Sequence, residues 1–239
     1  MPPAPVRGPT SRGFLDIQWT YPSYTPERKV SQHGESVSVA AKSALPLAEA
    51  FRVIAGDDPR PLLVLRECLT CTGTDDALLT RGADNEKTML LARWFHCVKL
   101  APSVLDENDP FHEVFAGEHP AHLFVSARDG SRRHDLNGQQ SRSELWGAME
   151  KELDSSYAKS HGAVLKKLFS YLGKFDTVDQ RIAEINGRRE DILEKEGPRS
   201  RKLAKLDKEL AKLRDEKADL RKKVLKVATL PLKKPEKTS

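Results

Sequence analysis

One short run, residues 61–65, is apolar at every position and limits the fold more than any other feature of the chain. It reads Pro-Leu-Leu-Val-Leu. Successive side chains of a strand point to opposite faces of its sheet, so a strand that is apolar throughout needs a cover on both faces. Helices lying on the two sides of a sheet provide such a cover. The run therefore predicts an α/β fold with a buried central strand.

Weaker patterns around this run indicate the other elements of the same domain. The predicted elements are, in order, a helix over 45–54, the strand over 61–66, a helix over 89–92, strands over 95–100 and 121–125, a hairpin turn at Asp129-Gly130 with a return strand over 132–136, and a helix from Glu144. This order predicts helices packed on a mixed sheet over residues 40–158. Residues 1–39 are rich in prolines, which break helices, and are expected to be irregular apart from an edge-strand pattern over 14–19.

The last third of the chain follows a seven-residue repeat. Its apolar residues keep an a/d register, which predicts a coiled coil over 176–228, after a helical connector over 159–175. Gly197-Pro198 predicts a break, because proline inside a helix costs about 3 kcal/mol. A turn there would give an antiparallel hairpin, which is slightly favoured, although the register runs through in phase and also permits one kinked helix. Residues 229–239 are expected to be a disordered tail.

Charge is spread unevenly along the chain, whose net charge is +5. Acidic residues slightly outnumber basic ones in residues 1–142, and the basic excess lies in 143–239. Basic clusters such as Arg221-Lys222-Lys223 have the chemistry to bind phosphates. Acidic residues are interleaved with them, so a solvated coiled-coil surface is the favoured interpretation and nucleic acid is not an expected partner.

The three cysteines are interpreted together with the compartment. No apolar stretch approaches the roughly 20 residues that span a bilayer, and no secretory signal pattern is visible at the N-terminus. The chain is therefore expected to be cytoplasmic, without a membrane partner. Because structural disulfides are rare in that reducing compartment, metal binding or catalysis is the expected use of a cysteine pair.

Two of the cysteines form a Cys-x-x-Cys motif, Cys68-Leu69-Thr70-Cys71, directly after the buried strand. A thiolate at the N-terminus of a helix has a lowered pKa and is the reactive form of the group. We therefore expect Cys68 to attack a disulfide and Cys71 to resolve the mixed disulfide. Arg66 would lower the pKa of Cys68 and Glu67 would raise it, and which of the two faces the sulfur is left open.

Other interpretations of these residues stay open. The two thiols could be inert, or could join His119 and His122, or His96, in a metal site. A second ligand pair at recognised spacing is absent from the sequence, so no metal is expected. The third cysteine, Cys97, lies in a predicted strand and is expected to fill the core.

The motif and its surroundings resemble the thioredoxin family. In the resembled bacterial group, Cys-x-x-Cys is followed some fifteen residues later by Asn-Glu, which here is Asn85-Glu86, and then by a helix and a strand. A proline, here Pro120, precedes the third strand, and the likeness covers roughly residues 40–158. The resemblance implies a thioredoxin-like sandwich of a mixed sheet with helices. It also implies that Pro120 is cis and sets backbone beside the cysteine pair, where it would bind a peptide.

Together these observations lead to two main hypotheses. The first is a thiol–disulfide oxidoreductase or redox sensor that acts through Cys68 and Cys71 and is positioned or oligomerised by its coiled coil. It would need no bound cofactor, only a protein disulfide or dithiol substrate and an electron donor. The second is a non-catalytic thioredoxin-fold scaffold whose coiled coil binds a partner or a second copy, with incidental cysteines. Whether the chain is an enzyme is left open between them. A third and weaker hypothesis is association with nucleic acid through the basic tail.

Overall fold

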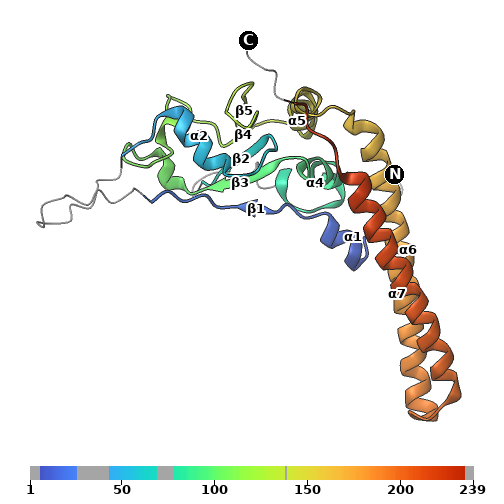
Figure 1. The fold of residues 1–239 in the computed structure, drawn as a ribbon. Helices are drawn as coiled ribbons and strands as arrows, with labels where there is room; N and C mark the ends of the chain where they lie inside the picture. The colour runs from blue at the N-terminus through green and yellow to red at the C-terminus, as the bar shows by residue number, and fades with distance from the viewer. Residues whose placement is uncertain (1–5, 26–42, 69–77, 138, 235–239) are drawn as a thin grey trace, which may run out of the picture. The chain divides into compact units, whose positions relative to one another are not determined.

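The apolar run forms the central strand of a sheet. The computed structural model describes residues 6–25, 43–68, 78–137 and 139–234 (Figure 1). Strand β2, Leu62–Arg66, is buried at every position. Both faces are therefore covered, as the sequence predicts.

The sheet has five strands in the order β1-β3-β2-β4-β5. The strands are β1 Trp19–Thr20, β2 Leu62–Arg66, β3 His96–Leu100, β4 Leu123–Ser126 and β5 His134–Leu136. Strand β3 runs parallel to both β2 and β1, whereas β4 is antiparallel to β2 and to β5. In the register of the central strands, Val64 lies between Val98 on β3 and Phe124 on β4. The chain is thus a mixed α/β fold, as predicted.

Helices pack on this sheet against apolar side chains of the strands, which point alternately to its two faces. On one face, Phe51 and Ile54 of helix α2, Leu47–Ala55, join Leu62 and Val64 in a buried cluster. Leu63 points to the other face and is fully buried as well. Helix α5 contacts β4 and packs against helix α4. The bounds of these two helices are α4 Glu86–Ala92 and α5 Arg142–Ser156, and three short 3-10 helices are η1 Ala83–Asn85, η2 Pro102–Leu105 and η3 His112–Val114.

The turn between β4 and β5 lies where the sequence predicts it. Gly130 has a φ of 81°, which glycine adopts without the strain that a side chain would bring. The amide of Ala127 donates to the carbonyl oxygen of Ser131 at 2.9 Å, and Asp129 accepts from the amide of Ser131 at 2.9 Å. A capping box of Ser141 and Glu144 then opens α5, at the helix start that the sequence indicates.

Two long helices form an antiparallel hairpin that is a compact unit separate from the sheet. They are α6, His161–Glu196, and α7, Arg201–Ala228. Apolar side chains of both helices, among them Val178, Ile185, Leu210 and Leu213, form a core of their own. Gly197 ends α6 with a φ of 76°, a conformation that glycine readily adopts. The hairpin, rather than one kinked helix, is therefore what the structure contains.

The first described residues of the chain belong to this helical unit. Helix α1, Pro9–Phe14, packs against α6. Thr10 donates to the Asp179 carboxylate through its amide at 2.7 Å and through its hydroxyl at 2.9 Å. Lys217 of α7 reaches the same carboxylate at 2.8 Å. Asp179 therefore holds α1 and α7 against α6.

Three segments follow the sequence-based expectations only in part. Residues 1–39 were expected to be irregular apart from an edge strand over 14–19. Their described part contains α1, which was not predicted, and the edge strand β1, which overlaps the predicted strand at Trp19 and pairs with β3. The predicted connector over 159–175 is helical from His161, but it is continuous with the predicted coiled coil in α6. The first residues of the predicted tail are ordered, since Leu232 forms an isolated antiparallel bridge with Tyr157. None of the helices among the described residues combines the length and apolar character needed to cross a membrane.

Candidate functional site

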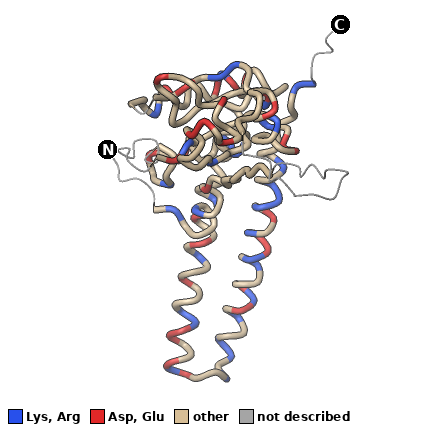
Figure 2. The backbone as a smooth tube through the Cα atoms, turned by 90° about the vertical axis from the view of Figure 1, so that its left-hand side faces the viewer, with Lys and Arg blue, Asp and Glu red and all other residues tan. Residues whose placement is uncertain are grey.

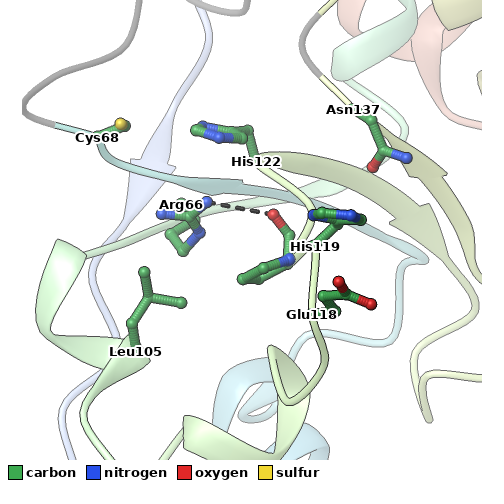
Figure 3. Close-up of a pocket in the computed structure, with 8 residues that line it drawn as sticks. Arg66, Cys68, Leu105, Glu118, His119, His122 and Asn137 are labelled. Carbon is green, nitrogen blue, oxygen red and sulfur yellow. Dashed lines mark hydrogen bonds between the residues drawn. The ribbon is translucent and has the colours of Figure 1, made fainter.

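A pocket of about 640 Å³ lies beside Cys68, two residues beyond the end of β2. The side chains that matter for its chemistry are Arg66, Cys68, His119, Pro120, His122 and Asn137 (Figure 3). Leu105 and Glu118 complete the lining. The pocket volume falls in the range of small-molecule sites.

Backbone hydrogen bonds fix the chain on both sides as it leaves β2. The amide of Arg66 donates to the carbonyl oxygen of His122 at 2.7 Å, which extends the pairing toward β4. The amide of Glu67 donates to the carbonyl oxygen of Leu100 at 2.8 Å, on the β3 side. Cys68 thus follows a segment that is anchored between two neighbouring strands.

The side chains of Arg66 and Glu67 point to opposite sides, as strand alternation requires. Arg66 is 5% exposed and lines the pocket with Cys68, whereas Glu67 is exposed and lies 3.9 Å from the Lys99 ammonium. The Arg66 guanidinium donates to the carbonyl oxygens of Pro120 and Ala121, at 3.3 Å each. The alternative that the sequence leaves open is therefore resolved: the residue that shares the pocket with Cys68 is the cation.

Pro120 lies in the pocket wall, but the expectation that its peptide bond is cis is wrong. No peptide bond in the described part of the chain is cis, so the His119–Pro120 bond is trans. Trans is the lower-energy form of such bonds by about 0.5–1 kcal/mol. The carbonyl oxygen of Pro120 is occupied by Arg66, which holds this segment in place before β4 begins.

The three cysteines fall into different settings. Cys68 is half-buried and disulfide-bonded in the structure, and Cys71 lies outside the described residues. Cys97 is a free, buried thiol on β3 that donates to the carbonyl oxygen of Ala92 at 3.4 Å. Burial raises the pKa of Cys97 to about 12, because the thiolate would lose its hydration. Cys97 is thus a core residue, as predicted.

The histidines considered as metal ligands do not gather around one point. His119 and His122 line the pocket with Cys68, but His96 instead contacts the Thr20 hydroxyl at 2.7 Å, through Nε2. In the described ranges, no three side chains among His, Cys, Asp and Glu are placed to hold a metal ion together. What His119 and His122 add to this pocket is two ring side chains that can donate hydrogen bonds.

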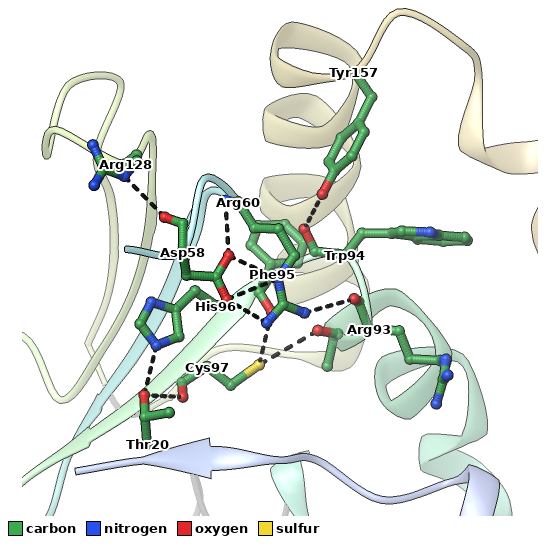
Figure 4. Close-up of polar contacts among 11 residues, drawn as sticks. Thr20, Asp58, Arg60, Arg93, Trp94, Phe95, His96, Cys97, Arg128 and Tyr157 are labelled. Carbon is green, nitrogen blue, oxygen red and sulfur yellow. Dashed lines mark hydrogen bonds and ion pairs between the residues drawn. The ribbon is translucent and has the colours of Figure 1, made fainter. Parts of the chain in front are cut away.

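A second polar cluster, near the start of β2, was not predicted from the sequence (Figure 4). The Arg60 guanidinium binds Asp58 with two nitrogens, at 2.6 and 3.0 Å to the two carboxylate oxygens, and donates to the carbonyl oxygen of Arg93 at 2.9 Å. Burial acts to raise the pKa of Asp58, but the hydrogen bonds from Arg60 outweigh it and the pKa is lowered. Burial lowers the pKa of His96 in the same cluster.

This second cluster connects elements rather than forming a cavity. Arg128 donates to the carbonyl oxygens of Gly56 and Asp58, at 2.5 and 2.8 Å, and so joins the end of β4 to the loop before β2. The Tyr157 hydroxyl donates to the carbonyl oxygen of Trp94 at 2.6 Å. The sequence signal that was available is the Asp-x-Arg spacing of Asp58 and Arg60, which places both side chains in one tight turn.

Comparison with known proteins adds no further constraint. No family model matches the chain, no curated protein matches it, and no solved structure matches it.

Proposed function

We propose that the chain is a thioredoxin-fold thiol–disulfide oxidoreductase or redox sensor that acts through Cys68 and Cys71. The observation that carries the proposal is the position of Cys68, which lines a pocket two residues beyond the central strand and shares it with a buried arginine. The strand order β1-β3-β2-β4-β5, with β2 and β3 parallel and β4 antiparallel to β2, supports the thioredoxin-like part of the proposal.

In the proposed reaction, the Cys68 thiolate attacks one sulfur of a substrate disulfide. A mixed disulfide forms between Cys68 and the attacked sulfur, and the other substrate sulfur leaves as a thiolate. The Cys71 thiolate then attacks Cys68, a disulfide forms between Cys68 and Cys71, and the substrate sulfur that was bound to Cys68 leaves as a thiolate. Two electrons have passed from the dithiol to the substrate, and an external dithiol donor must return them. The same steps in reverse oxidise a substrate dithiol.

Arg66 would favour the reactive state of Cys68. A cation close to a thiol stabilises its thiolate and lowers its pKa, and low exposure to solvent reduces the screening of that charge. Arg66 lies in the pocket wall and is nearly buried. The guanidinium donates to two backbone carbonyl oxygens, which hold it in the pocket wall.

One specific observation favours the second hypothesis, a non-catalytic scaffold. Pro120 is trans, and Arg66 already binds its carbonyl oxygen. The backbone that would bind a substrate peptide in the resembled family therefore has a different geometry here. In the scaffold hypothesis the sheet unit carries the helical hairpin, and the hairpin binds the partner.

Reduction of insulin by dithiothreitol, followed by turbidity, separates the two hypotheses. The wild-type chain should accelerate the reaction, Cys68→Ser and Cys71→Ser should each abolish the acceleration, and Cys97→Ala should keep it. Equal rates with and without the wild-type chain would favour the scaffold. The midpoint potential of the cysteine pair gives an independent test, since a disulfide that cannot be exchanged with a glutathione or thioredoxin redox buffer contradicts a redox role.

A further inference from the structure

The helical hairpin carries an unequal charge on its two helices. Helix α6 has equal numbers of basic and acidic residues, whereas α7 has 11 Lys and Arg against 5 Asp and Glu. Figure 2 shows Lys and Arg recurring along both helices, with Asp and Glu between them. Because acidic residues lie between the basic ones, a cationic site can form only where several basic side chains have no acidic partner.

Four cations line a single groove between the two helices. The groove has a volume of about 520 Å³, and its basic residues are Arg181 of α6 and Lys205, Lys208 and Lys212 of α7. All four side chains are exposed. Within the described residues, none of the four has a carboxylate oxygen within 4.0 Å. Their charge is therefore available to a ligand.

Several other cations of the hairpin are paired with acidic neighbours. Arg189 pairs with Asp207 at 2.9 Å, and Lys202 pairs with Glu196. Lys222 lies 3.9 Å from Asp219. The acidic residues that dilute the basic clusters in the sequence are thus partly engaged outside this groove. Two carboxylates, Glu209 and Glu216, do line the groove, and they reduce its positive field without removing it.

The shape and surroundings of the groove favour a nucleic acid over a membrane. From Lys205 to Glu216 the groove follows about 16 Å of helix, at about 1.5 Å per residue, which spans several phosphates of a strand. A helix that binds a membrane surface needs exposed apolar side chains to insert. On α6 and α7, Leu225 is the one large apolar residue that is exposed in the described structure, and it does not line the groove.

Helix α7 also lacks aromatic residues, on which proteins stack the bases of single strands. Lysine and arginine contacts to phosphates need no such residues and carry no sequence information. These features favour a duplex, bound through its backbone. We propose that Arg181, Lys205, Lys208 and Lys212 form a binding site for the phosphate backbone of a double-stranded nucleic acid, independent of base sequence. This inference goes beyond the proposed redox function and does not depend on it.

The test measures binding of the full-length chain to a fluorescein-labelled DNA duplex of about 20 base pairs, by anisotropy at several salt concentrations. Each phosphate contact contributes about −0.9 to the slope of the logarithm of the binding constant against the logarithm of the salt concentration, so four contacts predict a slope of about −3.6. The triple variant K205Q/K208Q/K212Q should lower the slope to about −0.9 and the affinity at about 50 mM salt by at least about tenfold. The variant E209Q/E216Q should bind more tightly than wild type.

A matched control separates a site from a general attraction. The variant R189Q/K202Q/K222Q removes the same number of positive charges from the same hairpin, but at ion-paired positions, and should keep most of the affinity and slope. The helical circular dichroism of each variant verifies folding. Equal losses in the two triple variants, absence of salt-dependent binding in wild type, or preferential binding to phosphatidylserine vesicles or polyglutamate over the duplex would each overturn the proposal.

Discussion

At the scale of single residues, the pocket depends on which of two neighbours faces the cysteine. Arg66 lines the pocket and Glu67 lies on the other side near Lys99, so the two charges act unequally on Cys68. The alternation of side chains along β2 continues from Arg66 to Glu67, so the two side chains lie on opposite sides. The residues themselves were visible in the sequence, but their directions depend on where the strand ends, and strand ends are poorly determined by local pattern.

The first prediction concerns the effect of Arg66 on the acidity of Cys68. In the reduced chain, Arg66→Gln should raise the pKa of the Cys68 thiol, because the thiolate loses a cation that lines the same pocket. Glu67→Gln should shift it much less, since Glu67 is outside the pocket. The pH dependence of iodoacetamide labelling, with the adducts mapped by mass spectrometry, gives the value. Cys97, whose pKa burial raises to about 12, should label only after unfolding. Equal shifts in both variants would contradict the assignment.

A second residue-scale prediction concerns Gly130 in the turn after β4. A Cβ at this position would overlap the ring of Phe51, and the φ of 81° is unfavourable for any residue with a side chain. Gly130→Ala should therefore lower the free energy of unfolding by about 2–4 kcal/mol, from backbone strain and overpacking together. Gly147→Ala in α5 is the matched control, because its Cβ would meet nothing within 4 Å. It should be neutral or stabilising by about 0.5–1 kcal/mol in urea unfolding.

At the scale of elements, the hairpin is held by one buried carboxylate as well as by its apolar seam. Lys217 is the polar exception in the a/d register, and the structure explains it by the ion pair with Asp179 at 2.8 Å. Burial acts to raise the pKa of Asp179, but hydrogen bonds from Lys217 and Thr10 outweigh it, and the pKa is lowered. A buried ion in such a seam favours one register of the two helices over others.

The third prediction is that this carboxylate makes the stability of the hairpin depend on pH. Because the folded pKa of Asp179 is lowered, its contribution is present above the unfolded value of about 3.9 and is lost as the pH falls through the folded value. Asp179→Asn should lower the free energy of unfolding by about 2 kcal/mol or more near pH 7. The difference from wild type should shrink below about pH 4. Urea unfolding followed by helical circular dichroism measures it, and a difference that stays constant over this range would contradict the assignment.

Elements with a strong local signal were predictable, and those defined by distant partners were not. The uniform apolar run gave β2, the Asp129-Gly130 pair gave the β4–β5 turn, and Asn85-Glu86 opens α4 where expected. Helix α1 has no amphipathic pattern of its own and depends on Asp179, far away in the sequence. The cis form of Pro120 was expected only from the family resemblance, whereas the structure has the trans form that X–Pro bonds ordinarily adopt.

At the scale of the whole molecule, two compact units share one chain. One comprises residues 17–158 with the C-terminal segment, and the other comprises 159–231 with the N-terminal segment. All three tryptophans, Trp19, Trp94 and Trp146, belong to the first unit. Tryptophan fluorescence therefore reports on the sheet unit, while most of the helical signal comes from α6 and α7.

The fourth prediction uses this division. Gly130→Ala should shift the unfolding midpoint seen by tryptophan fluorescence and leave the midpoint seen by circular dichroism nearly unchanged. Asp179→Asn should do the opposite, because additivity and independence are expected of sites without shared partners. Both signals should be recorded on the same urea titration. If each variant moved both midpoints equally, the chain would unfold as a single cooperative structure.

The pairing of Tyr157 with Leu232 affects how the length of the helical hairpin can change during evolution. The chain leaves the sheet unit at Ala158 and rejoins it at Leu232, and Lys233 donates to the carbonyl oxygen of Ser156 at 2.9 Å beside that exit. The chain thus leaves the sheet unit and re-enters it at neighbouring positions. Whole heptads can then be gained or lost at the far end, toward Gly197, without moving a single strand, so the reach of the hairpin is an adjustable length that evolution or a protein engineer can reset.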